Sequence, residues 1–309
     1  MIDIIIPNYN GADLLPTCLD ALRAQTRQDF CVVVVDDGST DGSRELLARH
    51  YPEVQVIAMA RNRGLAAAVN AAIEATGGEY VVLLNNDTEA DRRWIEHLVG
   101  ALEHYPAYDF AASKLMLFDR RDHIHSAGDY YRPDGVPGNR GVWQRDRGQY
   151  DVMEEVFGPC AGAAAYRRSA LEALAEGNKV LDEDLVMYCE DVDLNLRARL
   201  RGRRTIYVPR AVVYHKLSAT GGGSLASYYC GRNFVLVWAK NMPEPLVRRH
   251  LLAMLRSQLG FALGALWHIR EPAARARLRG QLDSLRALPR FLRKRRQRSS
   301  EAPAEVVLP

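Results

Sequence analysis

Short apolar runs alternate with amphipathic stretches through the first 120 residues. Strand-like runs of four to eight mostly apolar residues stand at Ile2–Ile6, Phe30–Val35, Val54–Met59, Tyr80–Leu84 and Phe110–Leu117. Helical spacing of apolar residues fills the intervals at Ala12–Ala24, Arg44–His50, Ala66–Ala75 and Asp91–His104. Continuous apolar runs are typical of strands buried on both faces, and their alternation with helices calls for right-handed crossovers. The pattern predicts an α/β fold with a mostly parallel central sheet and helices on both faces.

Three polar residues, Asn85, Asn86 and Asp87, follow the most apolar of these strands. Ligands of open parallel sheets bind beyond the carboxyl ends of the strands. A carboxylate flanked by two amides can hold a hard cation and the phosphate oxygens bound to it. The alternative is a plain turn, with Thr88 capping the helix that starts near Asp91.

A second polar loop, Asp36–Ser43, follows the strand that begins at Phe30. Its adjacent carboxylates, Asp36 and Asp37, suit the N–H groups of a base and the hydroxyls of a ribose, although such loops are also ordinary turns. The first strand leads into Pro7-Asn8-Tyr9-Asn10-Gly11 rather than into a GxGxxG sequence. This argues against a dinucleotide-binding unit.

The regular pattern ends between Asp119 and Asp151, and a loop of that length is either functional or disordered. Val156–Arg167 is small and apolar, which fits a closely approached backbone or a tightly packed strand equally well. Arg204–Pro209 is a further predicted strand. Thr220–Ser224 is glycine-rich, as expected of a lid that becomes ordered around a ligand.

An acidic group, Glu190, Asp191 and Asp193, opens a predicted helix. Acids in a first turn are favoured by the helix dipole, and Asp193 can pair with Arg197 four residues on. Glu190 and Asp191 then remain for chemistry, and a carboxylate near an acceptor hydroxyl is what a general base requires.

His215 follows another apolar run, Ala211–Tyr214. It is interpreted either as a buried structural histidine or as a ligand for a metal or a phosphate.

Composition limits the class of protein. The chain has 309 residues, 48% of them hydrophobic, enough for one large domain and an appendage. Its five cysteines form no CxxC pair, which disfavours a disulfide framework or a zinc site and fits a reducing compartment. We expect no signal peptide, because strand-like sequence starts at Ile2. We expect no membrane span either, because no apolar run reaches about 18 residues.

Positive charge is concentrated at the C-terminal end. Residues 241–309 carry 14 Lys/Arg against 5 Asp/Glu, whereas residues 1–240 carry 27 against 33. Leucines recur every three or four residues from Val247 to Ile269, and Phe291–Arg298 is polybasic. We therefore expect a main domain at 1–240 and a basic amphipathic helical extension with a polybasic tail at 241–309. The extension suits an anionic membrane surface, a face of the main domain or a second subunit in a homodimer; no motif supports nucleic-acid binding.

Six segments together resemble family 2 inverting glycosyltransferases of the GT-A fold, in particular the bacterial rhamnosyltransferase-like group. They are IPNYN (6–10), VDDGSTDGS (35–43), NRGLAAAVN (62–70), LLNNDT (83–88), EDVDLNLRAR (190–199) and VVYHKLSATGG (212–222). The segments lie within the first 240 residues and follow one another in the family's order.

The resemblance implies a role for each matching residue. Asp87 would coordinate Mg²⁺ or Mn²⁺ on the donor diphosphate, and His215 would complete the metal site. Asp191 would be the catalytic base, with Glu190 beside it. The residues that would bind the donor nucleotide are Pro7, Tyr9, Asp36, Asp37, Asn62, Asn85 and Asn86.

The implied activity is metal-assisted transfer of a sugar, rhamnose among the candidates, from a dTDP- or UDP-sugar to a glycan or lipid-linked acceptor in cell-envelope polysaccharide synthesis. The expected location is cytoplasmic, peripheral on the inner face of the cell membrane. Two other classes stay open at this point: a nucleotidyltransferase, and a non-catalytic nucleotide-sugar-binding membrane adaptor.

Overall fold

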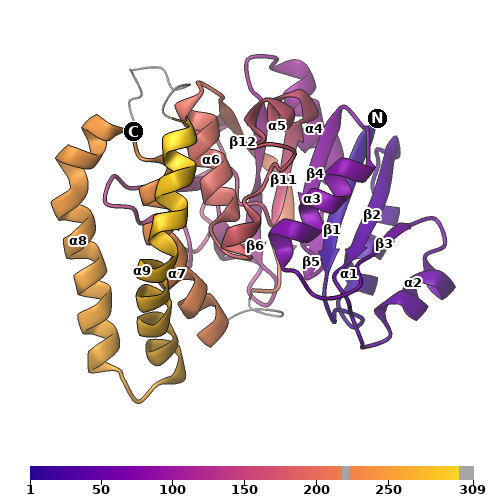
Figure 1. Ribbon diagram of the computed structural model, residues 1–309. Helices are drawn as coiled ribbons and strands as arrows, with labels where there is room; N and C mark the ends of the chain where they lie inside the picture. The colour runs from indigo at the N-terminus through magenta and orange to yellow at the C-terminus, as the bar shows by residue number, and fades with distance from the viewer. Residues whose placement is uncertain (218–222, 299–309) are drawn as a thin grey trace.

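The computed structural model describes residues 1–217 and 223–298 and shows a mixed α/β fold (Figure 1). The strands are β1 (Ile2–Asn8), β2 (Phe30–Asp36), β3 (Gln55–Ala58), β4 (Tyr80–Leu84), β5 (Thr88–Ala90), β6 (Phe110–Leu117), β7 (Ile124–Ser126), β8 (Asp129–Tyr131), β9 (Pro137–Asn139), β10 (Glu154–Val156), β11 (Ala163–Arg167) and β12 (Thr205–His215). The helices are α1 (Leu15–Arg23), α2 (Ser43–His50), α3 (Leu65–Ala75), α4 (Trp94–His104), α5 (Arg168–Leu174), the 3₁₀ turn η1 (Glu183–Leu185), α6 (Glu190–Leu200), α7 (Ser224–Asn241), α8 (Glu244–Trp267) and α9 (Pro272–Arg298).

The large sheet has the order β10-β12-β6-β11-β4-β1-β2-β3. Strands β1, β2, β3 and β4 are mutually parallel, as are β6 and β12, which confirms the mostly parallel sheet predicted from the sequence. Within the sheet β11 runs antiparallel between β4 and β6, and the short strands β5, β7 and β10 also pair antiparallel. The small side chains at the start of β11 are buried in this pairing. The segment 156–167, for which a tightly packed strand was one interpretation, contains the end of β10 and all of β11.

Helices cover both faces of the sheet. Alternate residues of β1 show the division, since Ile4 packs with α1, α2 and α4 and Ile5 packs with α3, α5 and α6. The region at 119–151, predicted to be a loop, instead contains three short strands: β7 pairs with β6 of the large sheet, and β8 and β9 form a separate two-stranded sheet. These pairings bring Ser126 and Asp129 into the protein interior.

Polar residues gather at one edge of the sheet because the parallel strands end there together. β1 ends at Asn8, β2 at Asp36, and β4 at Leu84, directly before Asn85. β12 ends at His215 and pairs with Thr88 of β5. Thr88 therefore lies in a strand and donates its hydroxyl to the carbonyl of Asn85, so the prediction that it caps the following helix is wrong.

The C-terminal helices stand beside the sheet domain, with α8 outermost (Figure 1). α7 and α9 lie in close contact at two glycines: a Cβ on Gly231 would lie 2.6 Å from the carbonyl oxygen of Arg277, and one on Gly280 would lie 2.1 Å from that of Tyr228. A hydrophobic cluster joins Leu236 of α7, Met254 of α8 and Phe291 of α9 to Leu196 of α6. The predicted boundary after residue 240 falls at the end of α7, and as a division into domains it stays a prediction.

Within the described residues, no helix combines the length and the apolar character needed to cross a bilayer.

Candidate active site

A carboxylate and an imidazole meet at the sheet edge. Asp87 Oδ1 lies 3.0 Å from His215 Nε2, and both residues are buried. Asn85 Nδ2 lies 3.4 Å from the same ring nitrogen. The turn after β4 and the end of β12 therefore bring together the two residues that the sequence predicted as metal ligands.

The donor set at this point fits a hard divalent cation. Asp87 Oδ1 is buried yet accepts no hydrogen bond, because its approach to His215 lacks hydrogen-bond geometry. An unpartnered carboxylate oxygen beside a ring nitrogen is a pair of ligands that Mg²⁺ or Mn²⁺ can share.

A second histidine, His125 of β7, supports the ring of His215. The two Nδ1 atoms lie 3.0 Å apart, so one ring donates and the other accepts. Burial, followed by the charge of His215, lowers the pKa of His125 to about 3 and keeps that ring neutral. When His125 accepts at Nδ1, His215 donates from Nδ1 and presents the lone pair of Nε2 toward Asp87. His125 was not predicted as a site residue, because its strand lies in the region predicted as a loop.

The loops after β1, β2 and β4 are tied together by side chains. Asn86 Nδ2 donates to Asn8 Oδ1 at 2.7 Å, joining the ends of β4 and β1. Asp36 is fully buried and accepts from Arg44 Nε at 2.5 Å. The carboxylate of Asp36 is therefore already paired with a cation that the protein itself supplies.

Asp37 holds the loop at 62–64 in place. Its two oxygens accept from the backbone N–H groups of Arg63 and Gly64, each at 2.8 Å. Asn62 is exposed and its Oδ1 accepts from the N–H of Gly64 at 3.1 Å. Pro7 is half-buried in β1, and Tyr9 is 46% exposed in the following loop. The predicted nucleotide-binding residues therefore share one edge, and their binding role stays a prediction.

Glu190 and Asp191 lie at the start of α6. Asp191 Oδ2 accepts from the N–H of Ala161 at 3.3 Å, and Oδ1 accepts from Val192. Burial raises the pKa of Asp191. Burial, followed by the charge of Asp191, raises the pKa of Glu190 to about 8, and Glu190 Oε2 is buried with no hydrogen-bond partner.

A third carboxylate, Asp129, faces Asp191 and was missed in the sequence. Ligand atoms of Asp129, Cys160 and Asp191 lie within 4.8 Å of one another. Asp129 Oδ1 accepts from Ser126 Oγ at 3.0 Å and from Asn139 Nδ2 at 2.7 Å. Burial and the charge of Asp191 raise its pKa. Its neighbours in sequence are polar turn formers, so only the pairing of β8 with β9 reveals its place.

The segment 160–162 links the two parts of the site. On one side its Ala161 N–H contacts Asp191. On the other, the carbonyl of Gly162 accepts from the backbone N–H of Asn85 at 2.9 Å. A Cβ on Gly162 would lie 3.4 Å from Asn85 Nδ2 and 3.5 Å from the ring of His215. The Asp87–His215 pair and the Asp191 carboxylate therefore flank the same three residues.

The lid predicted at Thr220–Ser224 lies largely outside the described residues, which omit 218–222.

Comparison with known proteins gives a consistent result. A sequence profile described as "Glycosyl transferase family 2" matches residues 3–175. The glycosyltransferase GlyA of Streptococcus pneumoniae is 32% identical over 136 residues, 42% of this chain, and the chain spans only 19% of that relative. The N-acetylglucosaminyl-diphospho-decaprenol L-rhamnosyltransferase of Mycobacterium tuberculosis is 28% identical over 257 residues, 72% of this chain and 78% of the relative.

Solved glycosyltransferases share the fold. The mannosyltransferase PcManGT from Pyrobaculum calidifontis, solved with GDP-Man and Mn²⁺, has a TM-score of 0.55 at 18% identity and covers 97% of this chain and 87% of its own. At this identity the likeness concerns the fold, which is the GT-A arrangement expected from the sequence.

Proposed function

Because the chain belongs to glycosyl transferase family 2, we propose that it moves a sugar from a nucleotide-diphosphate donor to an acceptor hydroxyl with inversion at the anomeric carbon. The observation that carries this proposal is the placement of Asp191 and the Asp87–His215 pair on either side of the segment 160–162. One part supplies a base and the other a place for the donor diphosphate.

Asp87 and His215 would hold the cation, Mg²⁺ or Mn²⁺, through Oδ1 and Nε2. When bound, such a cation neutralises charge that develops on the leaving diphosphate. Asn85 lies beside the pair and would contact the same phosphate group.

The Asp191 carboxylate would take the proton of the acceptor hydroxyl. The hydroxyl oxygen forms its bond to the anomeric carbon as the bond to the diphosphate oxygen breaks, and the electron pair leaves with the diphosphate. Attack from the opposite face in one displacement inverts the configuration. The N–H groups of Ala161 and Val192 would fix the carboxylate for this transfer.

The proposed donor and acceptor are supported by the rhamnosyltransferase of Mycobacterium tuberculosis, which matches 72% of this chain. Its name describes transfer of L-rhamnose to a diphospho-decaprenol-linked sugar. We therefore assign a dTDP- or UDP-sugar donor, rhamnose among the candidates, and a lipid-linked or polysaccharide acceptor of the cell envelope.

The decisive assay incubates the protein with nucleotide sugars, Mn²⁺ and an acceptor panel. Asp191→Asn and Asp87→Ala should each lower turnover by at least about 100-fold. Asp119→Asn, a change in an exposed acid, should leave turnover unchanged. Near-wild-type turnover in either site variant would eliminate the mechanism. Release of pyrophosphate in place of nucleoside diphosphate would identify a nucleotidyltransferase, and tight donor binding without transfer would identify a binding module.

We also infer that the α8–α9 hairpin lies on an anionic membrane surface at the cytoplasmic face. Leu252, Leu259 and Leu263 of α8 are 57–67% exposed, and Trp267 is 87% exposed. α9 adds exposed Leu282 and Leu285, and exposed arginines, such as Arg248 and Arg286, stand on both helices. Apolar stripes bordered by cations are typical of helices that lie in the interface.

This location is tested by sedimentation with phosphatidylglycerol vesicles. Leu259→Glu with Leu263→Glu should abolish pelleting, whereas Val152→Glu, at a 71% exposed position away from the hairpin, should not. Unchanged pelleting of the double variant would refute the membrane contact. If the double variant has a lower molecular mass than wild type in the absence of vesicles, the apolar stripe is instead the interface of a homodimer.

A further inference from the structure

The four residues before Glu190 have an unusual backbone. Val186, Tyr188 and Cys189 have φ values of 67°, 60° and 69°. Left-handed conformations cost non-glycine residues of order 1–3 kcal/mol each, and a β-branched residue such as Val186 tolerates them least. Three of them within four positions persist only if the surrounding structure holds them.

One side chain from α7 holds this segment. Asn233 is fully buried, and its Nδ2, whose two hydrogens are shared, lies within hydrogen-bond distance of three backbone carbonyls. The acceptors are Leu185 at 3.0 Å, Met187 at 3.0 Å and Tyr188 at 2.7 Å. Its Oδ1 accepts from Arg232 Nη1 at 2.8 Å, and the same Nη1 donates to the carbonyl of Asp184 at 3.0 Å.

The chemistry requires an amide at this position. If Asn233 were lost, the carbonyls of Met187 and Tyr188 would lose this donor, at a cost of about 1–3 kcal/mol for each unsatisfied group, whereas the carbonyl of Leu185 would still accept from the N–H of Met187 at 2.8 Å. Leucine has the same branched skeleton of four side-chain heavy atoms but no N–H group, and aspartate would present only acceptors to acceptors.

The segment 185–189 also contacts the loop at 62–64, on the side of the site proposed to bind the donor. The carbonyl of Val186 accepts from the N–H of Ala66 at 3.1 Å, and a Cβ on Gly64 would lie 2.6 Å from Val186 Cγ1. Gly64 is in turn held by Asp37. The segment therefore lies between the loop at 62–64 and the first turn of α6, and its conformation determines where α6 begins.

We propose that Asn233 is a positioning residue: it holds 185–189 in the strained conformation that places Asp191 for proton transfer. This assignment rests on the proposed role of Asp191 as base. It makes α7 part of the catalytic unit, because the amide acts through the backbone that leads directly into Glu190 and Asp191.

The test compares Asn233→Leu with a matched control, Asn70→Leu. Asn70 is similarly enclosed, at 3% exposure, and its amide binds the backbone at residues 180 and 181 and the side chain of Glu183 at 3.3 Å, but none of the strained residues 186–189. Both variants should lose similar stability in urea. Only Asn233→Leu should lower kcat, by about 100-fold, because displacing a catalytic group by about 1 Å has that effect. The affinity for UDP or dTDP with Mn²⁺, measured by thermal shift, should change less than about threefold.

Two further measurements separate positioning from general stability. Val186→Gly removes the penalty for a positive φ, so adding it to Asn233→Leu should restore kcat at least about tenfold. Hydrogen exchange of the amides at 185–192 should accelerate in Asn233→Leu and stay slow in Asn70→Leu.

Equal kcat values for the two leucine variants, or unaltered exchange at 185–192 in Asn233→Leu, would overturn the assignment. Retained turnover in Asp191→Asn would instead show that Asp191 is not the base. The hydrogen-exchange rates at 185–192 would still show whether Asn233 stabilises this segment.

Discussion

Asp191 and Asp193 lie two residues apart on α6, point to opposite sides of the helix, and differ in every other respect. Asp193 is 0% exposed and forms ion pairs with Arg197 and Lys240 at 2.8 Å and 2.9 Å. These cations hold the pKa of its carboxyl well below the usual range despite burial. Asp191 receives backbone N–H groups and faces the carboxyl of Asp129, and its pKa is raised.

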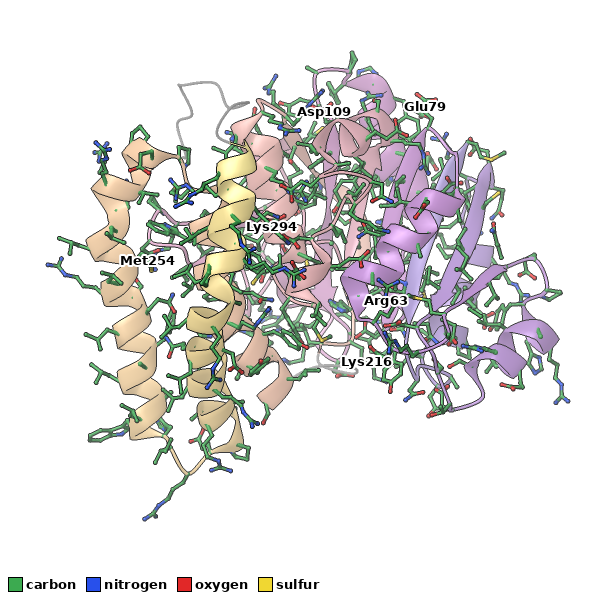
Figure 2. The ribbon with its side chains drawn as sticks, viewed as in Figure 1. Arg63, Glu79, Asp109, Lys216, Met254 and Lys294 are labelled. Carbon is green, nitrogen blue, oxygen red and sulfur yellow. The ribbon has the colours of Figure 1, made fainter. Side chains whose placement is uncertain are left out.

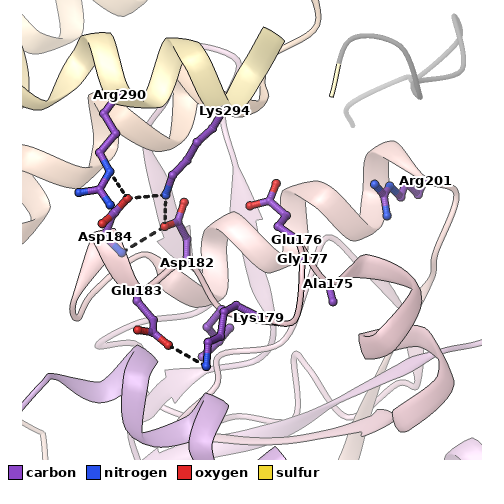
Figure 3. A pocket seen from close by; sticks show the side chains of 11 residues that line it. Ala175, Glu176, Gly177, Lys179, Asp182, Glu183, Asp184, Arg201, Arg290 and Lys294 are labelled. Carbon is purple, nitrogen blue, oxygen red and sulfur yellow. Dashed lines mark hydrogen bonds and ion pairs between the residues drawn. The ribbon is translucent and has the colours of Figure 1, made fainter. Parts of the chain in front are cut away.

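The cluster around Lys240 continues toward the C-terminal helices. Lys240 Nζ also contacts Asp182 at 2.6 Å and Glu176 at 2.9 Å. From α9, Lys294, which is labelled in Figure 2, pairs with Asp182 and with Asp184 (Figure 3). Because Lys294 points inward, part of the polybasic sequence attaches α9 to the sheet domain, which was one of the predicted roles of the extension.

The difference shows how one acidic sequence supplies both structure and chemistry. Carboxylates matched by buried cations keep their charge at all ordinary pH values, so they can only fix the fold. Carboxylates buried without a cation can gain or lose a proton near neutral pH, which is the property a base requires. The following predictions test this division, beginning with the largest effect.

Lys240→Met should destabilise the protein by about 3–5 kcal/mol, because it leaves buried Asp182 and Asp193 without their shared cation. The measurement is urea unfolding followed by circular dichroism. Lys179→Met is the control, since that lysine is 36% exposed and lies 3.5–3.6 Å from its acidic partners, Glu183 and Glu74. It should cost less than about 1 kcal/mol. Equal costs would mean that the cluster around Lys240 does not stabilise the fold.

Glu190→Gln should remove part of the pH dependence of stability. The folded pKa of Glu190, about 8, lies above its unfolded value near 4.5. Between these values the unfolded state has released a proton that the folded state keeps, so stability falls as pH rises, by about 1.4 kcal/mol per pH unit. The contribution is complete below pH 4.5 and lost above pH 8.

Unfolding free energies at pH 5, 6.5 and 8 measure this slope. The unfolding free energy of wild type should fall from pH 5 to pH 8. That of Glu190→Gln should fall less, so the stability of the variant relative to wild type should be greatest at pH 8. Glu172→Gln, at an exposed position, should retain the wild-type slope. A slope that Glu190→Gln leaves intact would show that Glu190 is already ionised in the folded protein.

Local sequence was sufficient to predict the elements that carry their own pattern. The strand at Tyr80–Leu84 and the helix from Glu190 to Leu200 have the expected bounds, because continuous apolar runs and acid-first helices are decided by neighbours in the chain. The pair Asp193–Arg197 was predictable for the same reason. Asp87 and His215 could be placed together only through the resemblance to a family.

Contacts between distant segments were not predictable. Asp129 looks like a turn residue until β8 pairs with β9, and His125 acquires its partner only through the pairing of β7 with β6. Asn233 lies 45–48 residues from the carbonyls it binds. In each case the informative quantity is burial of a polar group, which a single sequence does not encode locally.

The smallest predicted effect concerns Asp129 itself. Burial and the charge of Asp191 raise its pKa, which favours a neutral Asp129 beside an ionised Asp191. Asparagine reproduces a neutral carboxyl: Oδ1 can still accept from Ser126 and Asn139, and Nδ2 can donate toward Asp191. Asp129→Asn should therefore keep transfer at pH 7 within about threefold of wild type, against the loss of at least about 100-fold expected for Asp191→Asn. Asp129→Leu, which has no donor for Asp191, is the contrasting variant and should lose more activity than Asp129→Asn. A 100-fold loss in Asp129→Asn, measured as nucleoside diphosphate release, would require Asp129 to be ionised during transfer and would make the two carboxylates equivalent.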